Sequence, residues 1–510
     1  MICVSVGRAS HRHLVRERDF LAEQGARLVE MRLDYLQRLP ELATLLARER
    51  PTDSGGTMRR VAVVVTCRRK CDGGGWNYTE EQRLTTLRTA IAGGAEFVDL
   101  EEDIAAKIPR YGNTKRIISY HDFLSTPSDR ELDAIHDRLS ELDADIVKIV
   151  TMAREPVDNL RIFRLLQRKA KEKPTAAFCM GEIGIMSRLL CGRYGSVLSF
   201  CSGNAERRIA PGQLAFQAMV QTYRYDQISL KTEICCVIGD PIAHSLSPEI
   251  HNTAFHELGI DKVYIPIRIL PSDLNSFMRE VVPVLQIRGI SVTIPHKEAI
   301  IEYLDKYDGA SQEIGAVNTV VVSDKYRIGM NTDYHGILES LENGCRQRWN
   351  MDNPLAGRRV LVMGAGGVGR AICYCLSRRG ARVTLTNRSL QRAQNLGSRM
   401  NMEVVEWDRR DRGEYEMIIN ATPVGMTPNT NDTPYPVARL NPTMIVFDTI
   451  YTPENTLLIR GAQQKGCKTI TGVDMFVHQA AIQFRHFTQR EAPHAVMREA
   501  IRRATSVVRY

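Results

Sequence analysis

The most reactive side chains of the first 200 residues lie within or just after short β-branched runs. Lys148 lies in "DIVKIVT", His121 follows "RIISY", Arg68 closes "VAVVVTCR" and Arg188 follows "GIMS". An amine can condense with a carbonyl group, an imidazole can move protons, and a guanidinium can bind a carboxylate. A lone strand lysine is more often an edge residue that limits aggregation. Four such groups at successive strand ends instead favour a catalytic site.

Three further charges occur in "VEMRLD", where Glu30, Arg32 and Asp34 alternate with apolar residues. In an extended strand these three side chains share one face. On a half-exposed sheet that face would lie in water, which is the ordinary interpretation. The strands of a parallel barrel are covered by helices outside, so charged groups belong on the inner face or at the C-terminal mouth. We therefore expect these charges to join the same site.

The elements that would position these residues are eight strand-like runs before about residue 205. They read "ICVSVG", "ARLVEMRLD", "RVAVVVTCR", "EFVDLEE", "KRIISYHDF", "DIVKIVT", "TAAFCMGE" and "SVLSFCSG". Most are separated by segments whose apolar residues recur at the helical spacing of three and four. Eight β/α units in so short a chain predict an α/β fold that begins with a (β/α)8 barrel.

Residues 1 to 228 resemble type I 3-dehydroquinate dehydratase in "EMRLD", "YHDF", "VKI", "MSR" and "APGQ". The resemblance implies that Lys148 forms a Schiff base with the ring ketone of the substrate. His121 would act as general base and then as acid for the departing hydroxyl, and Arg188 would pair with the substrate carboxylate. The family positions that hold the ring hydroxyls correspond to Glu30, Arg32, Arg68 and Gln213, with Ser5 nearby.

Two residues depart from that family pattern. Asp72 in "RKCDGGG" replaces the usual Glu before the glycine pair, and Ile209 replaces the usual Ser two residues before the "PG" of "APGQ". A lid with a shorter carboxylate and one hydroxyl fewer would hold the substrate less tightly. A weakened dehydratase therefore stays an open alternative at this point.

A second pattern begins near residue 230, and from residue 357 "GRRVLVMGAGGVGRAICYCLSRRGARVTLTNRS" reads strand, glycine turn, helix and strand. Gly364, Gly366 and Gly369 have the G-x-G-x-x-G spacing of a Rossmann unit, which lets the backbone approach a pyrophosphate. The second strand ends in Asn387 and Arg388 without an acidic residue. A carboxylate there would bind a ribose hydroxyl and repel a 2′-phosphate, whereas Arg388 would attract it. NADP is therefore favoured over NAD.

Residues 233 to 490 resemble shikimate dehydrogenase in "GDPIAHSLSPEIHN", "VTIPHKE", "GAVNT", "NTDYHG", "GAGGVGRA", "NATPVGM" and "GVDMFVHQAA". The resemblance implies that Lys297 and Asp333 are the catalytic pair, because reduction of a ketone leaves an alkoxide that needs a proton. The implied substrate ligands are Ser245 and Ser247 for the carboxylate, Thr293, Asn318 and Gln479 for ring hydroxyls, and Tyr451 as a lining residue. The implied cofactor contacts are Gly364, Gly366, Gly367, Gly369, Asn387, Arg388, Thr422 and Gly472.

The expected domains are a barrel at 1–228, a substrate-binding domain at 229–348 and a Rossmann NADP-binding domain at 349–510 whose C-terminal helices return to the substrate domain. The net charge of +9 is scattered over 510 residues, which argues against a nucleic-acid partner. The 12 cysteines have irregular spacings without zinc-site partners, so no metal is expected. Met1 leads directly into "ICVSVG", and no apolar run has membrane-spanning length, so we expect a cytoplasmic protein without a targeting peptide.

The resulting hypothesis is a bifunctional enzyme of the shikimate pathway that acts on small molecules. The barrel would dehydrate 3-dehydroquinate, and the C-terminal half would reduce the product with NADPH. One alternative is a quinate/shikimate dehydrogenase with a weakened barrel, and another makes the barrel a noncatalytic binding or stabilising module. Lys148, His121 and Arg188 are all retained, which argues against both. The sequence leaves the oligomeric state and any channelling between the sites open.

Overall fold

The computed structural model describes residues 1–47, 49–51, 57–59, 61–243, 245–349 and 351–505. Arg60 and His244, which belong to quoted motifs, and the end of the expected cofactor domain at 506–510 lie outside these ranges. The chain forms two compact units. One contains residues 1–233 and 265–286, and the other contains residues 234–264 and 287–510.

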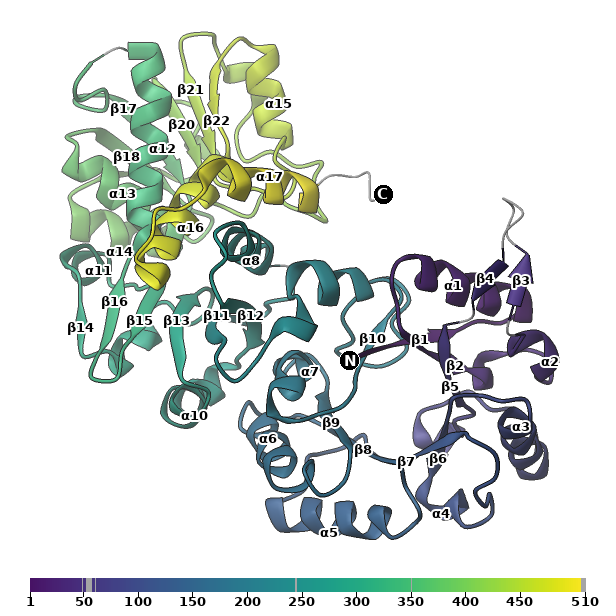
Figure 1. Ribbon diagram of the computed structural model, residues 1–510. Helices are drawn as coiled ribbons and strands as arrows, with labels where there is room; N and C mark the ends of the chain where they lie inside the picture. Colours follow the sequence, from purple (N-terminus) through teal and green to yellow (C-terminus); the bar gives the residue numbers. More distant parts are fainter. Residues whose placement is uncertain (48, 52–56, 60, 244, 350, 506–510) are drawn as a thin grey trace. The chain divides into compact units, whose positions relative to one another are not determined.

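The first unit is built on an eight-stranded parallel sheet with the order β10-β1-β2-β5-β6-β7-β8-β9. Its strands are β1 Ile2–Gly7, β2 Leu28–Arg32, β5 Ala62–Thr66, β6 Phe97–Glu101, β7 Lys115–Asp122, β8 Ile146–Met152, β9 Thr175–Met180 and β10 Ser199–Ser202. Figure 1 shows them as a ring with helices on the outside. Each of the eight predicted runs coincides with one of these strands, and only β8 extends beyond its run, by one residue to Met152, so the predicted barrel is confirmed.

The helices between the barrel strands are α1 His11–Glu23, α2 Leu42–Leu45, α3 Glu80–Ala92, α4 Glu102–Ala105, α5 Asp129–Ser140, α6 Asp158–Lys169 and α7 Ile185–Leu190. Three of them, α1, α3 and α5, begin at a side-chain cap. Reciprocal capping boxes start α3 at Thr79 and α5 at Ser128, which satisfies amide groups that the first turn leaves unpaired. A small hairpin that the sequence did not predict, β3 Glu49–Pro51 with β4 Thr57–Arg59, follows α2.

The second unit begins with a mixed sheet of order β12-β11-β13-β15-β16-β14. Its strands are β11 Glu233–Gly239, β12 Lys262–Arg268, β13 Ile287–Val292, β14 Lys306–Tyr307, β15 Thr319–Val322 and β16 Arg327–Met330. The helices of this part of the chain are α8 Ser247–Glu257, α11 Gly309–Ile314 and α12 Thr332–Trp349, whereas α9 Leu274–Ser276 and α10 Val282–Leu285 lie in residues 265–286 of the first unit. Ser247 starts α8, Thr319 starts β15 and Thr332 starts α12, so hydroxyl side chains occur where these elements begin.

The cofactor sheet is fully parallel, with the order β19-β18-β17-β20-β21-β22. Its strands are β17 Arg359–Met363, β18 Arg382–Thr386, β19 Glu403–Val404, β20 Met417–Asn420, β21 Ile445–Asp448 and β22 Lys468–Ile470. The helices are α13 Gly367–Arg378, α14 Leu390–Met400, α15 Leu457–Gln464, α16 Gly472–Thr488 and α17 His494–Thr505. The chain order reverses between β17 and β20, and ligands of such sheets bind at the carboxyl ends of the strands there.

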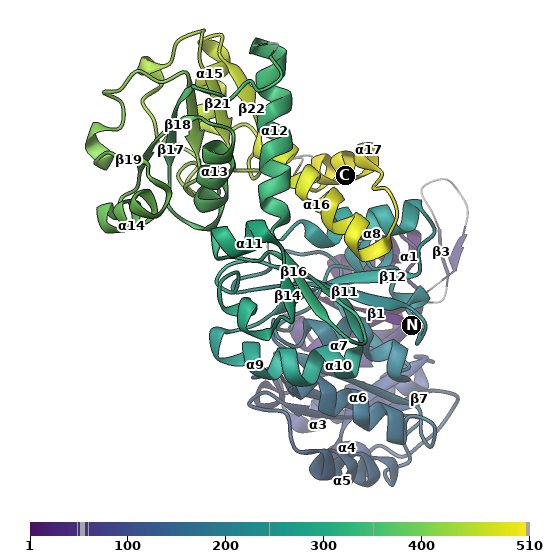
Figure 2. The same cartoon turned by 90° about the vertical axis from the view of Figure 1, so that its left-hand side faces the viewer.

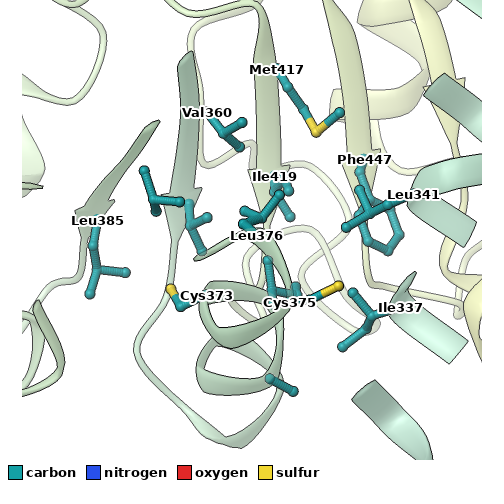
Figure 3. Packing of buried hydrophobic residues seen from close by; sticks show 14 of the residues in the cluster. Ile337, Leu341, Val360, Cys373, Cys375, Leu376, Leu385, Met417, Ile419 and Phe447 are labelled. Atoms are coloured by element: carbon teal, nitrogen blue, oxygen red, sulfur yellow. The ribbon is translucent and has the colours of Figure 1, made fainter. Parts of the chain in front are cut away.

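The core of the cofactor half lies between its sheet and helices α12 and α13. Figure 3 shows Ile337 and Leu341 of α12 near Phe447 of β21, and Leu376 of α13 beside Ile419 of β20. Parallel strands covered on both faces are continuous apolar runs, as in "RVLVM" and "MIIN". Met363 and Asn420, the last residues of β17 and β20, are register partners, so the carboxyl ends of the two strands lie side by side.

Helix α16 runs beside α12 in Figures 1 and 2, and glycine allows the close approach. A Cβ added at Gly336 of α12 would lie 2.9 Å from the backbone nitrogen of Gln479. Met497 and Ile501 of α17 pack in one apolar cluster with Ile250 and Ala254 of α8. Among the described residues no helix is long and apolar enough to span a bilayer.

Candidate active sites

Lys148 stands in the middle of β8 with its side chain inside the barrel and only 4% of its surface exposed. Its Nζ lies 2.8 Å from Oδ2 of Asp99 and 3.8 Å from Oε1 of Glu30. The ammonium also lies 4.0 Å from the ring centroid of Phe200 on β10. Residues of three other strands therefore converge on this amine, which excludes the interpretation of an edge-strand lysine.

Asp99 and Glu101 on β6 are site residues that the sequence reasoning missed. Arg68 donates to Asp99 at 2.8 Å, to Glu101 at 2.9 Å and to Ser119 at 3.1 Å. Burial alone would raise the pKa of Asp99, but the charges of Arg68 and Lys148 outweigh it and lower that pKa well below the ordinary value. The sequence did contain a signal for them, because in "EFVDLEE" Asp99 and Glu101 flank the apolar Leu100. The charges of "VEMRLD" alternate with apolar residues in the same way.

His121 lies near the end of β7, on the same side of the strand as Ser119. Removal from bulk water lowers the pKa of its imidazole well below 6.5, and the positive charges of Arg68 and Lys148 lower it further. Its ring stacks at a centroid distance of 6.1 Å on Phe123. The imidazole is therefore neutral at physiological pH and can accept a proton next to the Lys148 amine.

Arg188 on α7 is a buried guanidinium whose hydrogen-bond partners are neutral carbonyl groups. It donates to the carbonyl oxygens of Phe200 at 3.1 Å and Pro211 at 3.2 Å, and its Nε has no hydrogen-bond partner among the described residues. Within the described part of the chain no carboxylate pairs with it, and burial lowers its pKa to about 10. A buried cation without an anion fits the binding of a carboxylate ligand.

The other predicted residues of the barrel interior form hydrogen bonds and ion pairs with neighbouring protein side chains. Glu30 accepts from Ser5 at 2.6 Å and from Thr66 at 2.9 Å, which leaves it beside Lys148. Arg32 forms a bidentate pair with Asp34 at 2.9 and 2.8 Å. The prediction that Asp34 continues the strand was wrong, because β2 ends at Arg32 and Asp34 lies in a 3-10 turn. That turn lets the carboxylate fold back onto the guanidinium.

The two departures from the family pattern lie in loops at the carboxyl ends of the strands. Asp72 accepts from Nε of Arg69 at 2.6 Å, and Arg69 also pairs with Asp103. Gln213 directs its carbonyl oxygen to the amide groups of Ile209 at 2.9 Å and Ala210 at 3.2 Å. Gln213 thus shapes the loop through its oxygen.

Lys297 and Asp333 form the centre of the second site. Nζ of Lys297 lies 2.6 Å from Oδ2 of Asp333, and both side chains are mostly buried. Lys297 follows β13, whereas Asp333 is the second residue of α12, where a carboxylate favours the helix N-terminus. Burial raises the pKa of the Tyr451 phenol, and the negative charge of nearby Asp333 raises it further. The structure therefore brings a lysine, a carboxylate and a phenol together.

The serines predicted to bind a carboxylate lie at the start of α8. Ser247 is the first helical residue, and its amide donates to Oγ of Ser245 at 3.3 Å. Thr293 follows β13, and its amide donates to the carbonyl of Ile238 at the end of β11. Hydroxyl groups and the start of a helix therefore lie at the same edge of the mixed sheet, an arrangement that suits an anion.

The side-chain oxygen of Asn318 is occupied by hydrogen bonds within the protein. Its Oδ1 accepts from the Thr332 amide at 2.7 Å and from the hydroxyls of Thr319 and Thr332, each at 3.0 Å. Donors thus occupy the oxygen, so Nδ2 is the group left for a ligand. Gln479 of α16 is buried beside Gly336 of α12.

The glycine turn after β17 fits a dinucleotide. Gly364 has a φ of +117°, and a Cβ added at Gly369 would lie 2.1 Å from the Gly364 carbonyl oxygen, so side chains are excluded at both. Nothing lies within 4 Å of a Cβ placed at Gly366, the N-cap of α13. Open space beside the N-terminus of a helix suits a pyrophosphate. Gly367 lies near the side chain of Lys297.

A cleft of about 620 Å³ runs from the Lys297 segment past this turn to α14. Asn387 accepts from the Ala365 amide at 3.2 Å and so fixes the second strand end against the turn. Arg388 is exposed at the next position. The lining of the cleft includes three basic residues that the sequence reasoning missed, Arg370, Arg392 and Arg399. It also includes the acidic Glu298.

Thr422 and Gly472 lie at the carboxyl edge of the cofactor sheet. The amide and hydroxyl of Thr422 donate to Oδ1 of Asn420 at 2.9 and 2.7 Å. A Cβ at Gly472 would lie 2.4 Å from the Ile450 carbonyl oxygen, so α16 starts in contact with that loop. A second hollow of about 830 Å³ lies near Arg359 and Arg382 at the opposite, amino end of the strands. It contains none of the predicted residues.

Family models match both halves of the chain. The models are type I 3-dehydroquinase at residues 2–230, the shikimate dehydrogenase substrate binding domain at 237–320, shikimate/quinate 5-dehydrogenase at 348–425 and the shikimate 5'-dehydrogenase C-terminal domain at 472–502. No group of His, Cys, Asp and Glu side chains suited to hold a metal ion occurs within the described residues.

Relatives are similar to the whole chain or to its second half. A bifunctional 3-dehydroquinate dehydratase/shikimate dehydrogenase of Arabidopsis thaliana, described as chloroplastic, is 34% identical over 513 residues, covering 97% of this chain and 83% of the relative. An NADP(+) shikimate dehydrogenase of Shouchella clausii is 39% identical over 52% of this chain and 96% of its own length. A crystal structure of shikimate dehydrogenase in complex with NADP+ is 33% identical, with a TM-score of 0.51 over 55% of this chain and 98% of its own.

Proposed function

The chain belongs to the bifunctional 3-dehydroquinate dehydratase/shikimate dehydrogenase family, and from this premise we propose which of its residues carry the two reactions. The first half dehydrates 3-dehydroquinate to 3-dehydroshikimate. The second half reduces 3-dehydroshikimate to shikimate with NADPH. Both reactions belong to the shikimate pathway, and the product of one is the substrate of the other.

In the barrel, Lys148 attacks the ring ketone as a neutral amine and forms a Schiff base with loss of water. The iminium withdraws electrons, so His121 can remove the proton from the adjacent carbon. His121 then returns that proton to the departing hydroxyl, which leaves as water, and hydrolysis of the Schiff base frees the product and Lys148. The buried contacts of Lys148 with Asp99 and Glu30 support this role.

Arg188 binds the substrate carboxylate in this proposal, supported by its lack of an anionic partner among the described residues. Glu30, Arg32, Arg68 and Gln213 line the space for the ring hydroxyls, with Ser5 behind Glu30. Arg68 also pairs with Asp99 and Glu101, so in addition it holds those two carboxylates in place.

In the second half, Lys297 supplies the proton to the oxygen of the reduced ketone, and Asp333 orients it. Ser245 and Ser247 bind the substrate carboxylate, Thr293, Asn318 and Gln479 bind ring hydroxyls, and Tyr451 lines the pocket. The amide of Asn318 donates through Nδ2, because its oxygen already accepts three hydrogen bonds.

NADPH supplies the hydride when it is bound. We assign its pyrophosphate to the backbone at Gly364, Gly366, Gly367 and Gly369, where a Cβ at Gly366 would meet open space. Arg388 and Arg392 hold the 2′-phosphate near Asn387, and Thr422 and Gly472 approach the nicotinamide end. The domain limits at 228 and 348 and the cytoplasmic location expected from the sequence remain predictions.

The observation that carries the proposal is that each half places one lysine against a carboxylate, Lys148 with Asp99 and Lys297 with Asp333. The test is incubation of the whole protein with 3-dehydroquinate. Without NADPH we expect 3-dehydroshikimate, and with NADPH we expect shikimate. Reduction of added 3-dehydroshikimate without dehydration of 3-dehydroquinate would make the barrel a noncatalytic module.

A further inference from the structure

Asp448 ends β21 at the carboxyl edge of the cofactor sheet, and its side chain is fully buried. Its Oδ1 accepts from Nδ2 of Asn420 at 3.0 Å and from the Ile450 amide at 3.1 Å. Its Oδ2 accepts from Oγ1 of Thr456 at 2.7 Å. No cationic side chain pairs with this carboxylate in the described ranges, and burial raises its pKa to about 6. Burying a carboxylate without a cationic partner costs free energy, so the presence of Asp448 at this position needs an explanation. The groups that its oxygens hold supply one.

The first group that Asp448 holds is the cofactor loop, residues 421–426. Asn420 is the register partner of Asp448 on β20. Its Oδ1 accepts from the amide and hydroxyl of Thr422, and its Nδ2 donates to the Val424 carbonyl at 3.2 Å as well as to Asp448. The carboxylate accepts only, so it fixes which end of the Asn420 amide points toward Thr422.

The second group is the pocket loop, residues 449–453, which carries Tyr451. The Ile450 amide donates to Asp448, and Thr456, the N-cap of α15, donates to the other carboxylate oxygen. The two loops also touch directly. A Cβ at Gly425 would lie 3.8 Å from Cδ1 of Ile450, and Thr427, which directly follows the cofactor loop, donates its amide to the Thr452 carbonyl at 3.2 Å.

We propose that Asp448 is a positioning residue that holds the cofactor loop and the pocket loop in one arrangement, so that Thr422 and Tyr451 meet cofactor and substrate at the correct distance from each other. The inference rests on the proposed roles of Thr422 and Tyr451. Asp448 itself touches neither ligand, because its oxygens are turned to Asn420, Ile450 and Thr456. Its loss therefore acts on both binding steps through the loops.

The test uses the full chain with Asp448→Ala and the isosteric Asp448→Asn. Asp448→Ala should raise the KM for NADP and the KM for shikimate together, each by about 10- to 150-fold, the range for a lost hydrogen bond to a charged group. Asp448→Asn keeps an oxygen for Asn420 and Ile450, so it should restore most of both KM values. Dehydration by the barrel in the same sample should be unchanged and serves as an internal control.

A matched control is Thr384→Val, which removes a side-chain hydrogen bond to Glu403 of 3.0 Å within the same sheet. It should lower the melting midpoint without moving either KM. The proposal is overturned if Asp448→Ala behaves like this control, or if Asp448→Asn is as damaged as Asp448→Ala, which would point to the charge itself.

Two further sets of variants keep the result interpretable. If Asp448→Ala does not fold, Thr456→Val removes the donor to Oδ2 together with the N-cap acceptor of the Ile459 amide, and it should raise both KM values by about 2- to 10-fold; unchanged values would overturn the proposal. Thr422→Val and Tyr451→Phe test the underlying roles directly. If neither moves a KM, the proposed site assignment fails, whatever Asp448→Ala does.

Discussion

Oδ2 of Asp99 lies 2.8 Å from Nζ of Lys148, and the other oxygen of the same carboxylate accepts from Arg68 at 2.8 Å. One buried anion therefore holds two cations from different strands of the barrel. The arrangement places the amine beside Glu30 and near His121 before any substrate is present. An amine held in this way loses little side-chain freedom when it attacks a carbonyl carbon.

Lys148 should become covalently labelled when borohydride is added together with 3-dehydroquinate or its dehydration product. The reducing agent traps the Schiff base as a stable secondary amine on this residue. The measurement is the mass of the intact protein followed by peptide mapping. An adduct on another lysine, or normal dehydration by Lys148→Ala, would contradict the role.

Asp99→Asn should destabilise the barrel because it leaves Lys148 and Arg68 without their shared anion. Breaking one side of a buried pair costs roughly 3 to 5 kcal/mol. Lys148→Met relieves part of that imbalance, so the double variant should lose less stability than the sum of the single variants. Calorimetric melting of the four proteins measures the coupling. Additive losses would show that the contact has no energetic role.

The positions of the strands could be predicted from the sequence, whereas the partners of the buried side chains could not. Strand patterns predicted the barrel, and the glycine spacing predicted the cofactor turn, because both depend on local backbone geometry. Asp99 was missed because a buried carboxylate on one strand resembles an exposed one until the barrel brings Arg68 and Lys148 to it. Asp34 was placed on the strand because alternation continues past the residue where β2 ends.

The same limit applies to the second half. The pairing of Lys297 with Asp333 was available only through the family resemblance, since β13 and α12 are far apart in the chain. Arg392 and Arg399 carry no sequence signal of their own on an exposed helix. Their place in the cleft depends on how α14 packs against the glycine turn.

The acid limb of kcat/KM for dehydration should have its midpoint below pH 6.5. Burial and the charges of Arg68 and Lys148 lower the pKa of His121, so the neutral, basic form persists as the pH falls and is lost only below the ordinary pKa. His121→Ala should slow dehydration by about 10²- to 10⁴-fold. A limb with its midpoint at 6.5 or above would contradict this assignment.

Lys297→Ala should strongly reduce hydride transfer while NADPH binding and dehydration by the barrel stay nearly unchanged. Its amine contacts Asp333 and serves only the second reaction. Ser247→Ala should instead raise the KM for shikimate, because loss of a hydrogen bond to a carboxylate costs about 1.5 to 3 kcal/mol. Steady-state assays of both half-reactions on the same preparations distinguish these outcomes. Equal losses in the two half-reactions would contradict two separate sites.

Arg388 and Arg392 should set the preference for NADPH over NADH. Arg388 follows the strand end at Asn387, and Arg392 lines the cleft one turn further along α14. A charge-assisted contact with the 2′-phosphate contributes about 1.5 to 3 kcal/mol, or roughly a 10- to 150-fold preference. Arg388→Ala should therefore weaken NADPH far more than NADH, and Asn387→Asp should shift the preference further by repelling the phosphate.

The control for this prediction is Arg382→Ala, an exposed arginine that lines the hollow at the other end of the strands. It removes the same charge from the domain but should leave the ratio of kcat/KM for the two cofactors unchanged. Added salt should compete with NADPH more than with NADH in wild type, because NADPH carries the extra phosphate charge, and this difference should shrink in Arg388→Ala. A wild type that already prefers NADH would contradict the cofactor assignment. A ratio that does not move in Arg388→Ala or Arg392→Ala would instead remove these residues from the phosphate site, because the charge that they contribute would then not reach the cofactor.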